Sequence, residues 1–411
     1  MAQLNITLNQ EEILQLLSGD RDEAFKKLLT ESLNSILKAE SAQQLGAEPY
    51  ERTSARTDSR NGSRERELNT RIGTIVLTVP RHRNQPFRTL IFDNYKRSEA
   101  ALVSCMAEMV VNGVSTRKVT KVVETLCGTA FSKSSVSEVC RELDQAVHEF
   151  KNRYLDREYP FIFVDATYFK VRISHRVTTR AFMIAMAINS DGKREIIGFE
   201  SYDNESKKTW KAFFQSLKER GLSGLKVVTS DAHEGIIYGL SKTFPDVPWQ
   251  RCQVHFSRNV LEHAPSKYQT EIRDRLTSMY NASSIKEARR LRDCIINDFS
   301  DVAGKAMECL DNGFESSMTV MCLPKETKRY LRTTNVLERV NKELKRRSRV
   351  IGIFPNEKSI IRLMGSILLD IHNSYSVQSK VHIPERDMKQ LPEYEEELKQ
   401  LAKEQHKMMA A

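Results

Sequence analysis

The sequence has little cysteine and no long hydrophobic run. Its 7 cysteines are odd in number and scattered, with no CxxC pair, which excludes a disulfide framework and is typical of a reducing compartment. No stretch approaches the roughly 18 consecutive apolar residues that a membrane span requires. The N-terminus lacks both the basic and the apolar region of a secretory signal. These absences predict a cytoplasmic protein without a membrane span.

Acidic residues are outnumbered by basic ones. The 411 residues include 64 Lys and Arg and 54 Asp and Glu, which gives a formal charge of +10. An excess of this sign favours a polyanionic partner, either nucleic acid or an anionic membrane surface. The length is enough for two or three domains.

The N-terminal part of the chain alternates between helical and polar segments. Apolar residues recur at helical spacing over 9–45, and a break at 18–20 predicts two helices. Residues 46–70 are rich in Arg and poor in apolar side chains, so we expect a linker there. Residues 73–83 predict a short strand that ends at Pro80.

Residues 97–150 contain three short segments with helical spacing. Gly113 and Gly128 stand where helix C-caps are expected, and Ser135 and Glu138 offer a capping box for the third helix. Three short helices with tight turns suit a helix-turn-helix module, and they suit any small helical bundle equally well. DNA binding is therefore one of two open interpretations of this segment.

From residue 159 the pattern changes to β-rich runs. Three strands are followed by a helix, a strand, a helix, a strand and a helix. This order predicts an α/β fold, with an antiparallel meander and βα units in one mixed sheet, and it is also the order of a ribonuclease-H-like fold.

Charged helical patterning then predicts an insertion, two strong helices and a tail that is either a peripheral helix or frayed. The expected segments are N-terminal helices at 1–45, a linker and short strand region at 46–95, a helix-turn-helix-like domain at 96–152, the sheet domain at 153–264, the helical insertion at 265–331, the last helices of the sheet domain at 332–385 and a charged tail at 386–411.

Two aspartates interrupt apolar strands. Asp165 lies inside FIFVDATYFK, where a buried charge is costly unless something compensates it. Asp231 ends the strand LKVVTSD, at the edge where ligands bind to open sheets with helical crossovers. Each has a plainer alternative. Asp165 could be bonded to a backbone amide or paired with a Lys or Arg, and Asp231 could be a helix N-cap.

Glu338 is the third carboxylate of interest. The apolar residues of its helix recur every four positions from Val336 to Leu344, and at about 100° per residue Glu338 lies away from that stripe, on the side of Asn341. The plainer alternative is a capping box, in which Glu338 bonds back to Asn335.

The three carboxylates together have a chemical logic. Mg²⁺ and Mn²⁺ need hard oxygen ligands held by rigid elements, and two such ions stabilise both the attacking and the leaving oxygen of a phosphoryl displacement. Two aspartates from adjacent strands and a glutamate from a late helix can build such a site. We therefore predict Asp165, Asp231 and Glu338 as catalytic residues and ligands of two Mg²⁺ (or Mn²⁺) ions. Without metal, at least one should have a raised pKa.

At this point the sequence resembles a known family, the bacterial insertion-sequence transposases of the IS256/Mutator type, which carry a DDE catalytic core. The resemblance lies in three stretches: YERTSARTDSRNGSRERELNTRIGTIVLTVPRHR, SDAHEGI followed by WQRCQVHFSRNV, and TTNVLERVNKELKRRSRVIGIFP. It covers roughly residues 30–375 in the right order and implies the same three carboxylates. Within the first stretch, TDSRNGSRER carries Ser where the family pattern has aromatic residues, which bears on DNA contacts and not on the carboxylates.

The resemblance implies a DNA transposase of the bacterial cytoplasm, associated with the nucleoid. Such a protein binds double-stranded DNA, both the terminal inverted repeats of its element and the target. It cuts one strand with a metal-bound water and uses the freed 3′-OH to attack another phosphodiester. A homodimer that bridges two ends is also implied. Two rivals stay open: a non-transposing metal-dependent nuclease with the same core, and a catalytically silent DNA-binding regulator.

Cys252 and His255 have the spacing of metal ligands. A structural zinc needs four ligands, however, and the sequence offers no second pair at suitable spacing. The resemblance places this motif near the active site, so we expect Cys252 and His255, together with Asn335, beside the metal ligands or the DNA. A packed cysteine and a capping histidine are the plainer alternative.

The run from Lys328 to Arg349 holds nine Lys and Arg against two Glu. Because it surrounds Glu338 and has an apolar stripe of its own, phosphate binding is a better interpretation than a solvated face. The expected DNA contacts are Arg339, Lys342, Lys345, Arg346, Arg347 and Arg349, with Arg117, Lys118 and Lys133 of the preceding helical module.

Overall fold

The computed structural model divides the chain into two compact units, Met1–Glu142 and Leu143–Ala411. The structure describes residues 21–51, 53, 56–70, 73–89, 107, 109, 119, 133–349, 351–378 and 380–410, with the backbone alone at 21–24, 69, 133–139 and 409–410. The first predicted helix, most of the helix-turn-helix-like segment, Arg117, Lys118 and the side chain of Lys133 lie outside this description. No helix in the described ranges is both long enough and apolar enough to cross a membrane.

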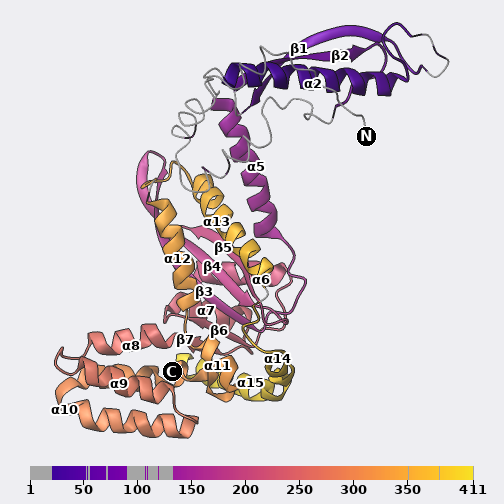
Figure 1. The fold of residues 1–411 in the computed structure, drawn as a ribbon. Coiled ribbons are helices and arrows are strands. Elements are labelled where there is room, and N and C mark those ends of the chain that lie inside the picture. Colours follow the sequence, from indigo (N-terminus) through magenta and orange to yellow (C-terminus); the bar gives the residue numbers. More distant parts are fainter. Residues whose placement is uncertain are drawn as a thin grey trace. The chain divides into compact units, whose positions relative to one another are not determined.

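In the first unit, the residues described between 21 and 89 form a helix packed on a two-stranded ribbon (Figure 1). Helix α2 (Arg21–Leu45) lies along the antiparallel strands β1 (Arg60–Thr70) and β2 (Gly73–His82). Strand β2 alternates buried and exposed residues, and its buried side chains pack against the buried Leu37 of α2. This alternation is the period expected of a strand with one covered face.

Strand β1 differs from the linker that we expected over 46–70. The described side chains of β1 include one that is apolar and buried, Leu68, in the cluster beneath α2, and the backbone of β1 is paired residue by residue with β2 from Ser63 to Thr70. A polar strand is therefore held by pairing with an amphipathic neighbour. Strand β2 also continues through Pro80 to His82, which an edge position permits because proline lacks only the N–H donor.

The second unit contains a mixed five-stranded sheet in the order β5-β4-β3-β6-β7, and the predicted order of strands and helices is confirmed. Strands β3, β4 and β5 form an antiparallel meander, with Gly192 in the left-handed region (φ 74°) in the loop before β5. Strands β6 and β7 run parallel to β3. The strand bounds are Phe161–Ile173, Arg176–Ile188, Arg194–Tyr202, Val227–Ser230 and Trp249–Arg251 for β3 to β7.

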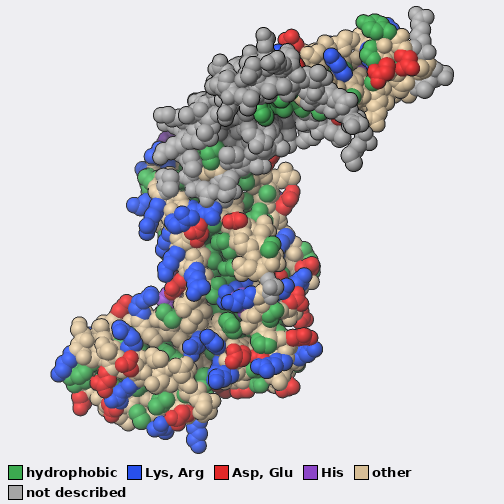
Figure 2. Space-filling model, in the orientation of Figure 1, with side chains coloured by type: hydrophobic (Ala, Val, Ile, Leu, Met, Phe, Trp, Pro, Cys, Tyr) green, Lys and Arg blue, Asp and Glu red, His purple; other side chains and the backbone are tan. Residues whose placement is uncertain are grey.

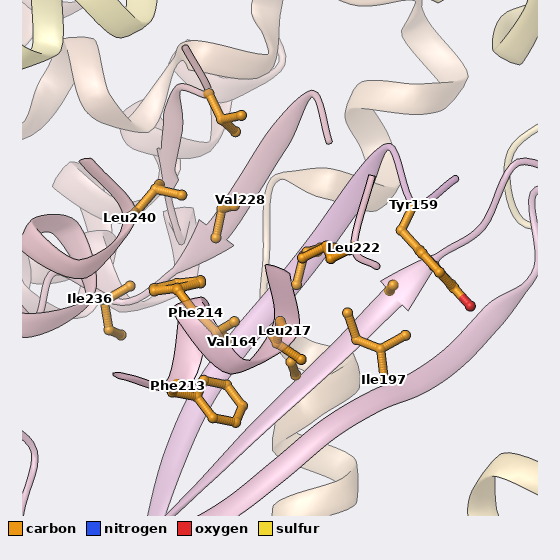
Figure 3. Close-up of a cluster of buried hydrophobic side chains, with 14 of the residues drawn as sticks. Tyr159, Val164, Ile197, Phe213, Phe214, Leu217, Leu222, Val228, Ile236 and Leu240 are labelled. Carbon is orange, nitrogen blue, oxygen red and sulfur yellow. The ribbon is translucent and has the colours of Figure 1, made fainter. Parts of the chain in front are cut away.

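Helices α6 (Lys207–Glu219) and α7 (Glu234–Thr243) cover one face of this sheet. Figure 3 shows Phe213, Phe214 and Leu217 of α6 among strand residues such as Val164. The other face packs against α13 (Glu357–Val377) and the end of α5 (Lys133–Asn152), where the Phe150 and Phe199 rings lie 5.7 Å apart. Because side chains alternate along β3, Asp165 points away from the Val164 cluster, toward this second face.

A helical bundle follows β7. Helices α8 (Gln253–Glu262), α9 (Gln269–Tyr280) and α10 (Ile285–Ser317) lie side by side (Figure 1) around a core of their own, which includes Phe256, Leu276 and Leu310. Helix α10 is kinked at Ala303 (φ −144°). The turn η1 (Thr319–Cys322) and helix α11 (Lys325–Leu331) then lead to α12 (Asn335–Ser348).

The charged C-terminal tail is docked, not frayed. It forms α14 (Glu385–Gln390), η2 (Leu391–Tyr394) and α15 (Glu395–Ala410), with Leu398 and Ala402 buried. The Gln405 amide accepts from the Trp249 backbone N–H and donates to its carbonyl, both at 2.8 Å. A side chain thereby bonds the polar backbone groups of β7, the last strand of the sheet, which would otherwise invite pairing with another chain.

Candidate active site

The sheet itself brings Asp165 and Asp231 together. Strand β3 pairs in parallel with β6 from Phe161 opposite Val227 to Phe163 opposite Thr229. Continuing this register by two residues sets Asp165 opposite Asp231. Neighbouring strands lie about 4.8 Å apart, and residues two apart share a face. The two carboxylates therefore face the same side of the sheet at neighbouring positions.

Asp165 is held by two hydrogen bonds. Its Oδ1 accepts from the Ala166 backbone N–H at 2.8 Å, and its Oδ2 accepts from the Asn341 amide at 2.7 Å. Within the described residues no Lys or Arg lies at ion-pair distance, so the ion-pair alternative is wrong, whereas the backbone-amide alternative holds for one oxygen. Burial and the neighbouring Asp231 charge raise the pKa of Asp165 to about 7, against the opposing effects of the Ala166 amide and His255. The predicted raised pKa is thus present.

Asp231 is not the N-cap of the helix that follows it. That position belongs to His233, whose Nδ1 accepts from the Gly235 N–H at 3.1 Å. Asp231 Oδ1 is buried and accepts no hydrogen bond from any residue that the structure describes. Burial, followed by the charge of Glu205, raises the pKa of Asp231. A buried carboxylate oxygen without a donor is a position that a cation could satisfy.

Glu338 lies in the first turn of α12, and the capping box suggested by the sequence does not form. The N-cap is Thr334, which makes no side-chain cap bond. Glu338 Oε1 lies 3.2 Å from His255 Nε2, at ion-pair distance but without hydrogen-bond alignment. One turn later on the same helix, Asn341 reaches Asp165. Helix α12 therefore links Glu338 to the aspartate pair.

Cys252 and His255 connect two helix starts. Cys252 is buried immediately before α8, and its sulfur accepts from the Thr334 N–H at 3.4 Å and from the Thr334 hydroxyl at 3.3 Å. Although burial opposes it, the polar contacts with His255 and Thr334 lower the pKa of the Cys252 thiol. The Cys252 sulfur, first of all, and then the Glu338 and Asp165 carboxylates raise the pKa of His255 against the effect of burial. Both residues lie beside the carboxylates.

Two residues near the site, Asn341 and Glu205, were missed in the sequence. The Asn335 side chain is exposed and makes no hydrogen bond with any described residue, so its place beside the metal ligands or the DNA stays a prediction, whereas Asn341 binds Asp165 directly. The available signal was its position three residues after Glu338, on the same side of the helix.

Glu205, the second missed residue, lies between the end of β5 and α6. It accepts from the Tyr168 hydroxyl at 2.7 Å and the Trp210 indole at 3.3 Å, and its charge raises the pKa of both Asp165 and Asp231. Because β5 runs parallel to β3 through the meander, the ends of the two strands share one edge of the sheet. A carboxylate just beyond a strand at that edge was the signal.

These carboxylates do not form a closed metal cage in this conformation. Across the described part of the chain, no group of three or more His, Cys, Asp and Glu side chains could hold a metal ion. Their chemistry nevertheless suits a hard cation, since Mg²⁺ and Mn²⁺ take carboxylate oxygens.

The predicted phosphate contacts lie on or near α12. Figure 2 shows Lys and Arg side chains gathered over the surface that this helix forms. Arg346 and Arg347 both pair with Glu343 at 2.7 Å, but Arg347 differs because its side chain is only 13% exposed and faces Asp370 of α13. That position argues against a DNA contact for Arg347. The exposed members of the set are Arg339, Lys342, Lys345, Arg346 and Arg349.

Comparison with known proteins identifies the chain. The family described as "Transposase, Mutator family" matches residues 1–378. The transposase for insertion sequence element IS256 in transposon Tn4001 of Staphylococcus aureus is 41% identical over 387 residues, which is 93% of this chain and 99% of the relative. The transposase for ISRM5 of Rhizobium meliloti is 37% identical, covering 86% of this chain and 89% of the relative. That for IS1081 of Mycobacterium tuberculosis is 36% identical, covering 90% and 89%. This chain therefore belongs to the Mutator family of transposases.

Proposed function

We propose that this transposase cuts and joins DNA strands at Asp165, Asp231 and Glu338. The observation that carries the proposal is the parallel register of β3 and β6, which sets two half-buried carboxylates side by side. The plain structural roles explain the pair only in part: the Ala166 amide bonds one oxygen of Asp165, which has no cationic partner among the described residues, and Asp231 caps no helix. Glu338 is tied to the same place through Asn341 and His255.

We also propose that the sheet is ribonuclease-H-like. The order β5-β4-β3-β6-β7 supports this, with three antiparallel strands followed by two parallel ones. Such an order puts the first and fourth strands, β3 and β6, next to each other. The helical bundle α8–α11 then enters before the helix that bears the glutamate.

The residues present fit two Mg²⁺ or Mn²⁺ ions. Asp165, Asp231 and Glu338 would hold them, and Asp231 Oδ1 is a buried oxygen with no donor among the described residues. Bound ions of this kind stabilise the charge on the attacking and leaving oxygens of a phosphoryl displacement. The protein's own part is to hold the carboxylates rigidly, through the Ala166 and Asn341 bonds to Asp165.

The chemistry would be two in-line displacements. In the first, a water oxygen bonds to phosphorus while the bond to the 3′ oxygen breaks, which leaves a 3′-OH and a 5′ phosphate. In the second, that 3′-OH attacks another phosphodiester and one strand is joined as another is cut. No covalent bond between protein and DNA forms in either step. Such displacements depend on positioning and charge stabilisation.

The proposed partners are double-stranded DNA ends and a second copy of the chain. Terminal inverted repeats and target DNA would both present phosphates to the exposed cations of α12, such as Lys345. A homodimer would hold two ends at once, which the joining step requires.

The test is an end-cleavage and joining assay with the full chain, Mg²⁺ and a labelled duplex carrying a candidate end. Asp165→Asn, Asp231→Asn and Glu338→Gln should each lose nicking and joining to the same background, because members of one catalytic unit act together. Asp246→Asn removes an exposed carboxylate from the same unit and should keep both activities. Full activity in the three variants would refute the assignment. Nicking without joining would indicate a nuclease, and DNA binding alone a regulator.

A further inference from the structure

A groove beside the proposed site is lined by arginines from three separate elements. It lies between α8 and α9, with the turn before α12 along one side, and has a volume of about 560 Å³. Arg258 comes from α8, Arg273 from α9 and Arg332 from the residues just before α12. One carboxylate, Glu262, also lines it.

The three arginines differ from the other arginines of the bundle. Throughout the described residues, none of the three lies at ion-pair distance from a carboxylate; Arg332 donates instead to the Asn281 amide oxygen at 2.9 Å. The remaining arginines of α9 and α10 are each paired with at least one acid: Arg275 with Glu271 and Asp298, Arg289 with Glu315, Arg290 with Glu287, and Arg292 with Asp293 and Asp311. Among the described arginines of α9 and α10, Arg273 is thus the one without an ion pair, and it lines the groove together with Arg258 and Arg332.

The groove adjoins the catalytic glutamate through two short connections. Gln253 and Val254 line it and directly precede His255, which faces Glu338. The Gln253 N–H also donates to the Arg332 carbonyl at 2.9 Å. An anion in the groove would thus lie next to the elements that position Glu338.

We propose that this groove binds the phosphate backbone of the DNA flanking the phosphate that is cut. The proposal rests on the function proposed above, and it assigns a partner surface to the bundle α8–α9. Guanidinium groups suit phosphate because their planar fork donates two parallel hydrogen bonds. Convergence of three such groups from separate elements, with a single acid among them, favours a polyanion over a neutral or cationic ligand.

The first experiment measures DNA binding by the full chain against salt, using a fluorescein-labelled duplex of arbitrary sequence. Each phosphate contact contributes about 0.9 to the slope of log K against log salt. Arg258→Ala and Arg273→Ala should each flatten that slope by about one, equally on any sequence. Arg290→Ala removes the same charge from α10, where the side chain is already paired, and should leave the slope unchanged. Equal slopes for Arg273→Ala and Arg290→Ala would overturn the proposal.

The second experiment places a photo-crosslinking residue, p-benzoylphenylalanine, on α9. In place of Thr277, which lines the groove, it should crosslink to the duplex. In place of Ser278, which is exposed but does not line the groove, it should not, and crosslinking from both positions alike would also refute the groove. The two proposals fail separately: a cleaving Asp165→Asn protein contradicts the catalytic assignment, whereas unchanged slopes with inactive Asp165→Asn contradict the groove alone.

Discussion

Removing the charge of Asp165 should stabilise the metal-free protein, and more so at high pH. Burial and Asp231 raise the pKa of this carboxyl from 3.8 to about 7. A carboxyl whose pKa is raised by folding binds its proton more tightly in the folded state. The free energy of unfolding therefore falls as the pH rises from about 4 to 7. At about 1.4 kcal/mol for each pKa unit, the loss reaches about 4 kcal/mol at pH 8. Partial exposure of the side chain makes this an upper figure.

Asp165→Asn removes that penalty and loses one acceptor. Both oxygens of Asp165 accept hydrogen bonds, and an amide can accept only one of them, which costs about 1 kcal/mol. The net gain at pH 8 is therefore about 3 kcal/mol. At pH 5 the native carboxyl is mostly protonated and the gain shrinks to under about 1 kcal/mol.

The assay is urea unfolding in EDTA, followed by tryptophan fluorescence. The chain has two tryptophans, Trp210 and Trp249, and both are buried in the second unit, so the signal reports that unit alone. Asp246→Asn, which changes an exposed carboxylate, should shift neither midpoint. An Asp165→Asn protein that is less stable than the native chain at pH 8, or offset equally at both pH values, would refute the electrostatic account of this site.

Two further variants test Glu205 and the packing of α6 against α7. Glu205→Gln removes a charge that raises the pKa of Asp165 and Asp231, so the acid limb of the pH–cleavage profile should move to lower pH; an unmoved limb, as expected of the exposed Glu219→Gln, would contradict this. Gly239→Ala would bring a Cβ within 2.8 Å of the α6 backbone at Lys211, and urea unfolding should show a loss of about 1–3 kcal/mol. The added Cβ of Gly304→Ala meets open space, so this variant should lose no stability. Equal urea midpoints for the two variants would show that α6 and α7 can move apart to accommodate the Gly239→Ala methyl group.

Hydrophobic periodicity predicted the helices and strands of the second unit well because these elements bury apolar side chains of their own. The strands from β3 to β5 are long and apolar, and a charge at Asp165 is conspicuous in such a run. Strand β1 could not be predicted in this way, since its order depends on pairing with β2 and not on an apolar face of its own. Residue propensities do not predict a strand that is stabilised mainly by pairing with a neighbouring strand.

The residues around the three carboxylates were harder to predict because each acts across a large sequence separation. Asn341 meets Asp165 from a helix 176 positions away. In the sequence, Glu205 looks like any polar residue before a helix. Only the antiparallel meander of β3, β4 and β5 places it at the edge of the sheet that holds Asp231. Spacing along the chain reveals such residues only after the strand order is known.

The contacts of Cys252 and His255 explain their spacing without a metal. Cys252 bonds to Thr334, which lies four residues before Glu338, and His255 lies three residues after Cys252. Three and four residues are each about one helical turn. The Cys252–Thr334 and His255–Glu338 contacts are therefore two successive contacts, about one helical turn apart, between the starts of α8 and α12. The two side chains also contact each other, and each has a further partner at the start of α12, so the Cys252–Thr334 contact sets the level at which His255 meets Glu338.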